Sequence, residues 1–226
     1  MATITKFWVG QQSMEEGTAP SISPSVLELI HQGVAFNTSG NSPAEKAILS
    51  WAGMGLKMDM AKTKKSCAIL AVEDSNPQKN GSGVLIGRSI DDTVHVHWKG
   101  AAEMILAMCW SYYDASGAVK DIDDGEKAKL EQMIRGMGMA AGSLGCIGFA
   151  HKQVAEEEYD YLKLDGNRFG LMVDPVPVPV GTAVLVTGWH KCCTNRTQVS
   201  RYRSIYGNSS SDIVILNDNS ASVSTS

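Results

Sequence analysis

The stretch from Thr93 to Cys109 (TVHVHWKGAAEMILAMC) constrains the fold more than any other part of the chain. Its first half alternates with period two, so apolar side chains fall on one face of a predicted strand and polar ones on the other, ending at Lys99. Gly100 then leads into an apolar helix predicted over Ala101 to Cys109. A lysine beside the free N–H groups of a helix N-terminus suits a phosphate group. An ordinary half-buried strand with a solvated lysine fits the same residues and is the commoner arrangement.

The rest of the first 169 residues reads as strands separated from helices. Ser23-Pro24 and the capping-box pattern Ser42-Pro43-Ala44-Glu45 predict two helix starts, and in the second the Glu45 carboxylate is expected to reach back to the N–H of the cap residue. Apolar spacing predicts a further helix over Asp124 to Met139. The predicted strands are Thr3 to Val9, Cys67 to Glu73, Ser82 to Arg88, Thr93 to Lys99 and Leu144 to His151. Short polar links between neighbouring strands predict an α+β domain, an antiparallel β-sheet flanked by helices, that ends near Phe169.

The composition and periodicity of the sequence change towards the C-terminus. DPVPVPVG is proline-rich, HKCCTNRTQVSRYRS has no periodicity, and only Thr182 to Thr187 and Asp212 to Leu216 resemble strands. We therefore divide the chain into a domain over residues 1–169 and an irregular, poorly ordered remnant over 170–226.

Composition excludes several classes of protein. A net charge of -4 does not fit a nucleic-acid-binding surface, and no apolar run is long enough to span a bilayer. The N-terminus lacks the features of a signal peptide, so we expect a cytoplasmic chain with no direct membrane insertion. Five scattered cysteines without CxxC spacing support neither a disulfide framework nor a zinc site.

Local motifs give weak signals for chemistry. There is no GxxxxGK[ST] phosphate loop, and the glycines of GMGMAAG close a predicted helix, whereas a dinucleotide-binding loop must open one. Asp121, Asp123 and Asp124 before Gly125 resemble part of a calcium loop, but the glycine falls one position early and no glutamate closes the loop, so we expect these acids to cap and solvate the next helix. His95 and His97 share a strand face and could supply two metal ligands, but no third ligand is near in sequence, so we expect that face to be solvated and predict no metal site.

Four segments carry a resemblance to a known family: EKAILSWAGMGLKMDM, VHVHWKGAAEMILAMCWSYYDASG, GMAAGSLGCIGFAHK and SSDIVILNDN. Together they closely resemble the nucleotide-binding domain, with scraps of the phosphorylation domain, of plant autoinhibited P-type calcium pumps. The resemblance extends from Thr3 to about Lys163. It implies an antiparallel sheet flanked by helices that binds ATP with Mg²⁺, on the cytosolic side of a membrane, and works with the remaining pump domains.

The resemblance also assigns residues. Lys99, Gly100 and Ala101 match the family KGA motif, in which the lysine lies at the floor of the adenine pocket and the glycine lets the base approach. Glu45 matches the family glutamate near the adenine amino group. Lys79 matches one basic residue of a nucleotide-binding loop.

Other positions depart from the family pattern. Ser75 replaces an adenine-stacking phenylalanine, Asn80 stands where more positive charge is usual, and Gly145 replaces a phosphate-contacting arginine. In the tail, Trp189 stands where a TGD motif has its aspartate. The DKTGT phosphorylation motif and membrane helices are absent from the chain, so we expect no pumping from it alone. Its function is therefore predicted to be weakened ATP binding, or alternatively that of a non-catalytic remnant or protein-interaction module.

Overall fold

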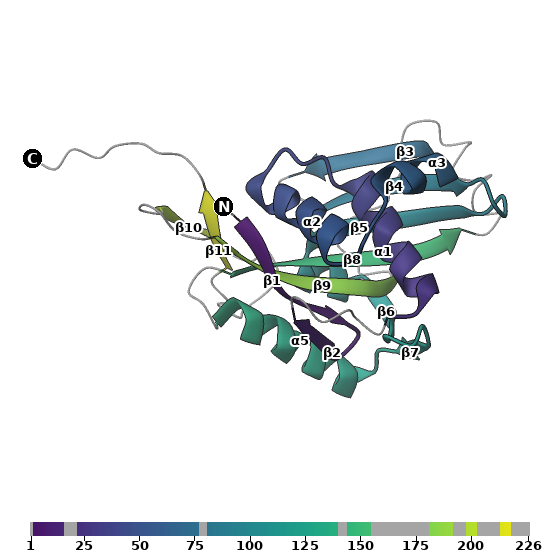
Figure 1. Ribbon diagram of the computed structural model, residues 1–226. Helices are drawn as coiled ribbons and strands as arrows, with labels where there is room; N and C mark the ends of the chain where they lie inside the picture. Colours follow the sequence, from purple (N-terminus) through teal and green to yellow (C-terminus); the bar gives the residue numbers. More distant parts are fainter. Residues whose placement is uncertain are drawn as a thin grey trace, which may run out of the picture.

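The computed structural model describes residues 2–15, 22–76, 81–139, 144–154, 181–191, 198–202 and 213–217. Nine of the described strands form one sheet, whose main path runs β2-β1-β9-β8-β5-β4-β3, with β6 joined to β9 and β7 to β6 (Figure 1). All of these pairs are antiparallel except β6 with β9. The predicted fold class, an antiparallel sheet flanked by helices, is confirmed.

The elements follow in chain order. The strands are β1 (Ala2–Val9), β2 (Gln12–Glu15), β3 (Cys67–Asn76), β4 (Gly81–Arg88), β5 (Val94–Ala101), β6 (Cys109–Tyr113), β7 (Val119–Asp121), β8 (Leu144–Val154), β9 (Gly181–Lys191), β10 (Gln198–Tyr202) and β11 (Ile213–Asn217). The helices are α1 (Pro24–Asn37), α2 (Pro43–Met54), α3 (Met60–Ser66), α4 (Ala102–Ala107) and α5 (Asp124–Met139). None of the described helices is long and apolar enough to cross a membrane.

Capping chemistry sets the helix starts as predicted. Ser23 and Ser42 precede a proline at the first helical position, and their hydroxyl oxygens accept hydrogen bonds from the third residues of α1 and α2. Asp123 does the same for α5 by accepting from the N–H of Glu126 at 2.8 Å. These side chains satisfy backbone donors that a helix leaves unpaired at its start, which fixes where each helix begins.

The sheet has a buried layer on each face. On one side α1 and α2 pack on the sheet around Ile30, Ile48 and Phe149. On the other side α4 and α5 pack on it around Trp98 and Ile134. Burying two such layers provides the main free-energy gain of the fold, because it removes apolar surface from water.

Two predicted boundaries are wrong. The helix after Gly100 is only six residues long, and Cys109 already belongs to β6, which pairs in parallel with β9. The aperiodic segment near Arg201 contains β10, which pairs with β11. In both places another strand supplies the hydrogen bonds, from a distant part of the chain for β6 and from the next strand for β10, so periodicity within the segment carried no signal.

The C-terminal region contributes to the main sheet. β9 lies between β1 and β8, so residues 181–191 complete the sheet that the first part of the chain begins. Trp189 pairs with Ile4 and Gly145 in these ladders. The predicted domain boundary near residue 169 falls outside the described residues and stays a prediction.

The polar face of β5 is buried, which corrects the expectation of a solvated face. Strand alternation is as predicted, but α1 covers the histidine side, so His95 and His97 are 3% and 1% exposed. The neighbouring strand β8 adds His151, 5% exposed, whose ring lies 5.0 Å from that of His95 and 5.1 Å from that of His97. The result is a buried histidine cluster of His95, His97 and His151.

One hydrogen-bond chain fixes the tautomers of two of these histidines. Thr93 Oγ1 donates to Asp91 at 2.7 Å, so it must accept from Nε2–H of His95, which lies 2.7 Å away. A neutral His95 then has a bare Nδ1, which accepts from Nε2–H of His151 at 2.7 Å. This leaves Nδ1 of His151 as a buried acceptor without a partner, and Nε2 of His97 is also buried without one.

Burial keeps the histidine cluster neutral. It lowers the pKa of His95 to about 4 and that of His151 to about 3, and the nearby Arg88 guanidinium acts in the same direction, while Asp91 opposes it at His95. The pKa of His97 is also well below 6.5, because the ring is buried and lies beside the other two. Burial also lowers the pKa of His31 on α1, and the nearby charge of Glu28 partly offsets this effect.

We predict that the fold loses stability as pH falls below about 6.5. The histidines of the unfolded chain then bind protons, whereas those of the folded chain stay neutral because their pKa values are lower. Each histidine adds up to about 1.4 kcal/mol per pH unit to this slope. Urea unfolding at several pH values above about 5, where most carboxylates are still ionised, measures it. The variant His97→Gln should lower the slope of unfolding free energy against pH by the contribution of about one bound proton. An unfolding free energy of the parent chain that does not change with pH in this range would contradict the prediction.

Candidate functional site

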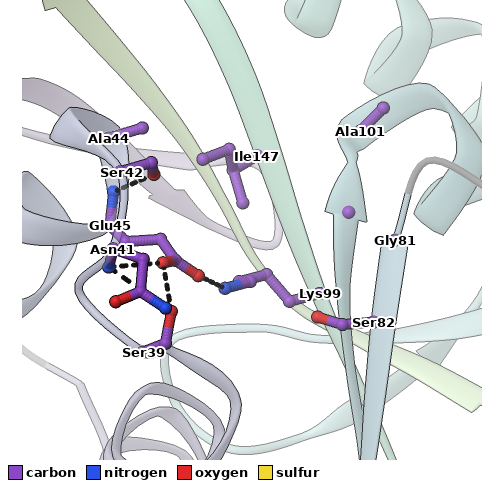
Figure 2. A pocket seen from close by; sticks show the side chains of 11 residues that line it. Ser39, Asn41, Ser42, Ala44, Glu45, Gly81, Ser82, Lys99, Ala101 and Ile147 are labelled. Atoms are coloured by element: carbon purple, nitrogen blue, oxygen red, sulfur yellow. Dashed lines mark hydrogen bonds and ion pairs between the residues drawn. The ribbon is translucent and has the colours of Figure 1, made fainter. Parts of the chain in front are cut away.

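A pocket of about 460 Å³ opens where the start of α2 meets the ends of β4, β5 and β8. Figure 2 shows the side chains that line it, with those of Glu45 and Lys99 pointing toward each other. The lining residues are Ser39, Asn41, Ser42, Ala44, Glu45, Gly81, Ser82, Lys99, Gly100, Ala101 and Ile147. Four residues singled out in the sequence, Glu45, Lys99, Gly100 and Ala101, are therefore brought together.

An ion pair closes one side of the pocket. Nζ of Lys99 donates to Oε1 of Glu45 at 2.5 Å, and the two side chains are only 12% and 19% exposed. Lys99 reaches Glu45 because it lies on the face of β5 that α1 and α2 cover. The lysine is thus paired with a carboxylate rather than held for a phosphate at the start of the six-residue α4.

The other carboxylate oxygen of Glu45 is held by the loop before α2. Oε2 accepts from the hydroxyl of Ser39 at 2.6 Å and from the backbone N–H of Asn41 at 3.1 Å. Ser42 caps the helix by accepting from the N–H of Glu45 at 3.1 Å. The capping-box prediction is right for the serine, but Glu45 reaches back to Asn41, one residue before the cap.

These contacts keep Glu45 ionised. Burial alone would raise its pKa, but the hydrogen bonds from Lys99 and Ser39 and the lysine charge outweigh burial and lower the pKa from 4.5 to about 2. The carboxylate therefore stabilises the fold fully above about pH 4.5 and loses that contribution as pH falls toward about 2.

The wall opposite the ion pair is small and apolar. Gly81 and Gly100, which pair with each other, line the pocket. Gly148, the other partner of Gly100, is not among the lining residues: a Cβ there would lie 2.8 Å from the Cβ of Ile105, on the face of β8 that α4 covers. Ala101 pairs with Ile147, and both line the pocket. A charged pair facing an apolar wall suits a flat ring with a polar edge.

The remaining predicted positions lie on β3 and β8 or outside the described residues. Ser75 is near the end of β3, one residue before Asn76, which pairs with Gly81. Gly145 is in β8, two residues before Ile147 and so on the same face of that strand. Lys79 and Asn80 lie outside the described residues. Within those residues, no group of three His, Cys, Asp or Glu side chains is placed to hold a metal ion.

Sequence reasoning missed the polar partners of the pair. Ser39, Asn41 and Ser82 all line the pocket, yet none of them was assigned a role from the sequence. For Ser39 and Asn41 the available signal was the run of Ser, Thr and Asn in the segment FNTSGNS, since such side chains readily bond neighbouring polar groups.

Comparison with known proteins identifies the family. A family model for the cytoplasmic domain N of P-type ATPases matches residues 25–175, so the chain belongs to that family. It is 46% identical over 180 residues to calcium-transporting ATPase 12, plasma membrane-type, of Arabidopsis thaliana, covering 72% of this chain. It is 42% identical over 185 residues to putative calcium-transporting ATPase 13 of the same species, covering 75% of this chain. It is 39% identical over 184 residues to calcium-transporting ATPase 7 of Oryza sativa subsp. japonica, again covering 75%. In each case the match covers 17% of the length of the relative.

We predict that Glu45 and Lys99 are energetically coupled. Glu45→Gln should cost about 2 kcal/mol of unfolding free energy, less than the loss for a fully buried pair because both groups touch solvent. A double-mutant cycle with Lys99→Met, followed by urea unfolding near neutral pH, measures the coupling, which should exceed about 1 kcal/mol. Ser39→Ala is the control, since it removes one hydrogen bond and keeps the ion pair. Additive effects of Glu45→Gln and Lys99→Met would show that the pair contributes nothing.

Proposed function

We propose that this chain binds ATP as the nucleotide-binding domain of a P-type calcium-transporting ATPase. The observation that carries the proposal is the Glu45–Lys99 pair at the edge of a pocket whose opposite wall is glycine and alanine, in a chain of this family. In this proposal Lys99, Gly100 and Ala101 form the floor of the adenine pocket, and Glu45 accepts a hydrogen bond from the adenine amino group.

The donors and acceptors of the pocket fit an adenine ring. An ionised carboxylate offers about four acceptor positions. Glu45 uses three of them, for Lys99, Ser39 and Asn41, so Oε1 keeps one for an incoming N–H. A volume of about 460 Å³ is also within the range of small-molecule sites.

Affinity is proposed to be weaker than a complete family site would give. Ser75 offers no ring to stack on the base, a contact worth about 1–3 kcal/mol by analogy with nucleic-acid bases. Gly145, on the pocket face of β8, offers no guanidinium to the phosphates. Among the described lining residues the only cation is Lys99, which is already paired with Glu45. Lys79, between β3 and β4 in the sequence, is proposed to supply further charge, whereas the neighbouring Asn80 is neutral.

Magnesium is proposed to arrive with the nucleotide, where it neutralises part of the phosphate charge. The chain itself contributes the base end of the site.

The role of the whole protein is a further proposal. The relatives are named as calcium-transporting ATPases, and this chain corresponds to a small part of their length. We propose that the chain acts on the cytosolic side of a membrane together with the other pump domains. The second candidate function, a non-catalytic remnant or interaction module, is favoured by the residues at 75 and 145.

ATP titration by calorimetry tests the proposal. The chain should bind ATP with a dissociation constant on the order of 1 mM, or about -4 kcal/mol. Lys99→Ala should weaken binding at least about tenfold, because it removes a pocket donor and releases the carboxylate it positions. Lys62→Ala is the matched control, because Lys62 is an exposed lysine on α3. Helix α3 leads into the start of β3, which pairs with the end of β4 opposite to Gly81 and the pocket. Absence of saturable binding at several millimolar would favour the interaction module instead.

Restoring the two missing contacts should tighten ATP binding. We predict that Ser75→Phe combined with Gly145→Arg lowers the dissociation constant at least about tenfold, because a stacked ring and a charge-assisted phosphate contact each contribute more than about 1 kcal/mol. Calorimetry on the single and double variants measures this. An unchanged constant in the folded double variant would show that these positions do not border the bound nucleotide.

A further inference from the structure

Asn37, the last residue of α1, makes an unusual set of hydrogen bonds. Its side chain is buried, and its Nδ2 donates to the backbone oxygen of Ser82 on β4 at 3.1 Å and to that of His97 on β5 at 3.2 Å. Its Oδ1 accepts from the hydroxyl of Ser82 at 2.7 Å. One amide therefore binds two neighbouring strands at once, and three of its four hydrogen-bonding positions are used.

These two strands carry one side of the pocket. Ser82 lines the pocket and pairs directly with Lys99 in the β4–β5 ladder. The other carbonyl belongs to His97, two residues before Lys99. Hydrogen bonds to these backbone oxygens fix the distance between the two strands and the end of α1. They therefore also fix the position of the Lys99 backbone, from which its side chain extends.

The chain that follows Asn37 carries the other side of the pocket. Two residues on, Ser39 donates to Glu45, and so does the N–H of Asn41. The backbone of Asn37 thus leads directly into the loop whose Ser39 and Asn41 hold Glu45. Its side chain meanwhile binds β4 and β5, and β5 carries Lys99. Asn37 itself does not line the pocket.

We propose that Asn37 is a positioning residue for the pocket: its buried amide sets the spacing between the loop that holds Glu45 and the strands that carry Lys99. That the pocket binds ATP rests on the proposed function, whereas the spacing between the Glu45 loop and the strands that carry Lys99 does not. The simpler alternative is that Asn37 only satisfies buried polar groups and holds α1 on the sheet.

Gln32 provides a matched control for that alternative. It is another buried amide on α1, 1% exposed, and its Nε2 donates to Glu28 on the same helix at 3.1 Å. It lies more than a helical turn before Asn37 and does not line the pocket. If Asn37 has only a structural role, Asn37→Ala and Gln32→Ala should affect the site alike once both variants are folded.

The decisive readout needs no nucleotide. Carbon-detected NMR on the full chain follows the Glu45 carboxyl between about pH 7 and pH 4, where its pKa of about 2, which depends on its contacts with Lys99 and Ser39, keeps it ionised in the parent chain. Asn37→Ala should raise that pKa toward 4.5, while Gln32→Ala should leave it unchanged. Ser82→Ala, which removes only the hydroxyl bond, is the milder variant if Asn37→Ala unfolds, and it should move the pKa in the same direction by less.

Nucleotide affinity is the second readout. Asn37→Ala should weaken ATP binding at least about fivefold, and Gln32→Ala by less than about twofold. If the parent chain fails to bind ATP, the proposed function fails while the Glu45 titration still decides this inference. An unchanged Glu45 titration in folded Asn37→Ala and Ser82→Ala, or an equal shift in Gln32→Ala, would overturn it.

Discussion

The structure depends on β5 being buried on both faces. Its apolar face packs with α4 and α5, and its polar face lies under α1 and α2, so its polar side chains must be paired inside the protein or stay uncharged. Two histidines meet this demand by staying neutral beside His151. Lys99 meets it through Glu45, and the carbonyl of His97 meets it through Asn37.

The candidate site follows from that constraint. A lysine at the end of a doubly covered strand is mostly removed from water, so it pairs with a carboxylate, and that carboxylate is in turn held by Ser39 and Asn41. The polar groups that satisfy the buried strand are thus the same groups that give the pocket its donors and acceptors. Stability and binding are therefore coupled here, and changes to the pair should alter both.

Local signals predicted the elements well, while contacts between distant segments were out of reach. The limits of α5 were predicted correctly, because an aspartate cap and regular apolar spacing are local features. The alternation in β5 correctly separated its two faces, but a strand pattern cannot tell water from a covering helix, so the burial of His95 and His97 was missed. The capping box gave the place of Glu45, whereas its ion pair with Lys99 joins segments 54 residues apart.

The central claim is that ATP binds at the Glu45–Lys99 end of the sheet. The most direct measurement is a set of ¹H–¹⁵N spectra of the labelled chain during an ATP titration with Mg²⁺. The account predicts saturable shifts for the amides of Glu45, Gly100 and Ala101, with little change at Arg88 and Val94, which lie at the opposite end of β4 and β5. Saturable shifts at Arg88 and Val94 with none at Gly100, or no saturable shifts at all, would contradict it.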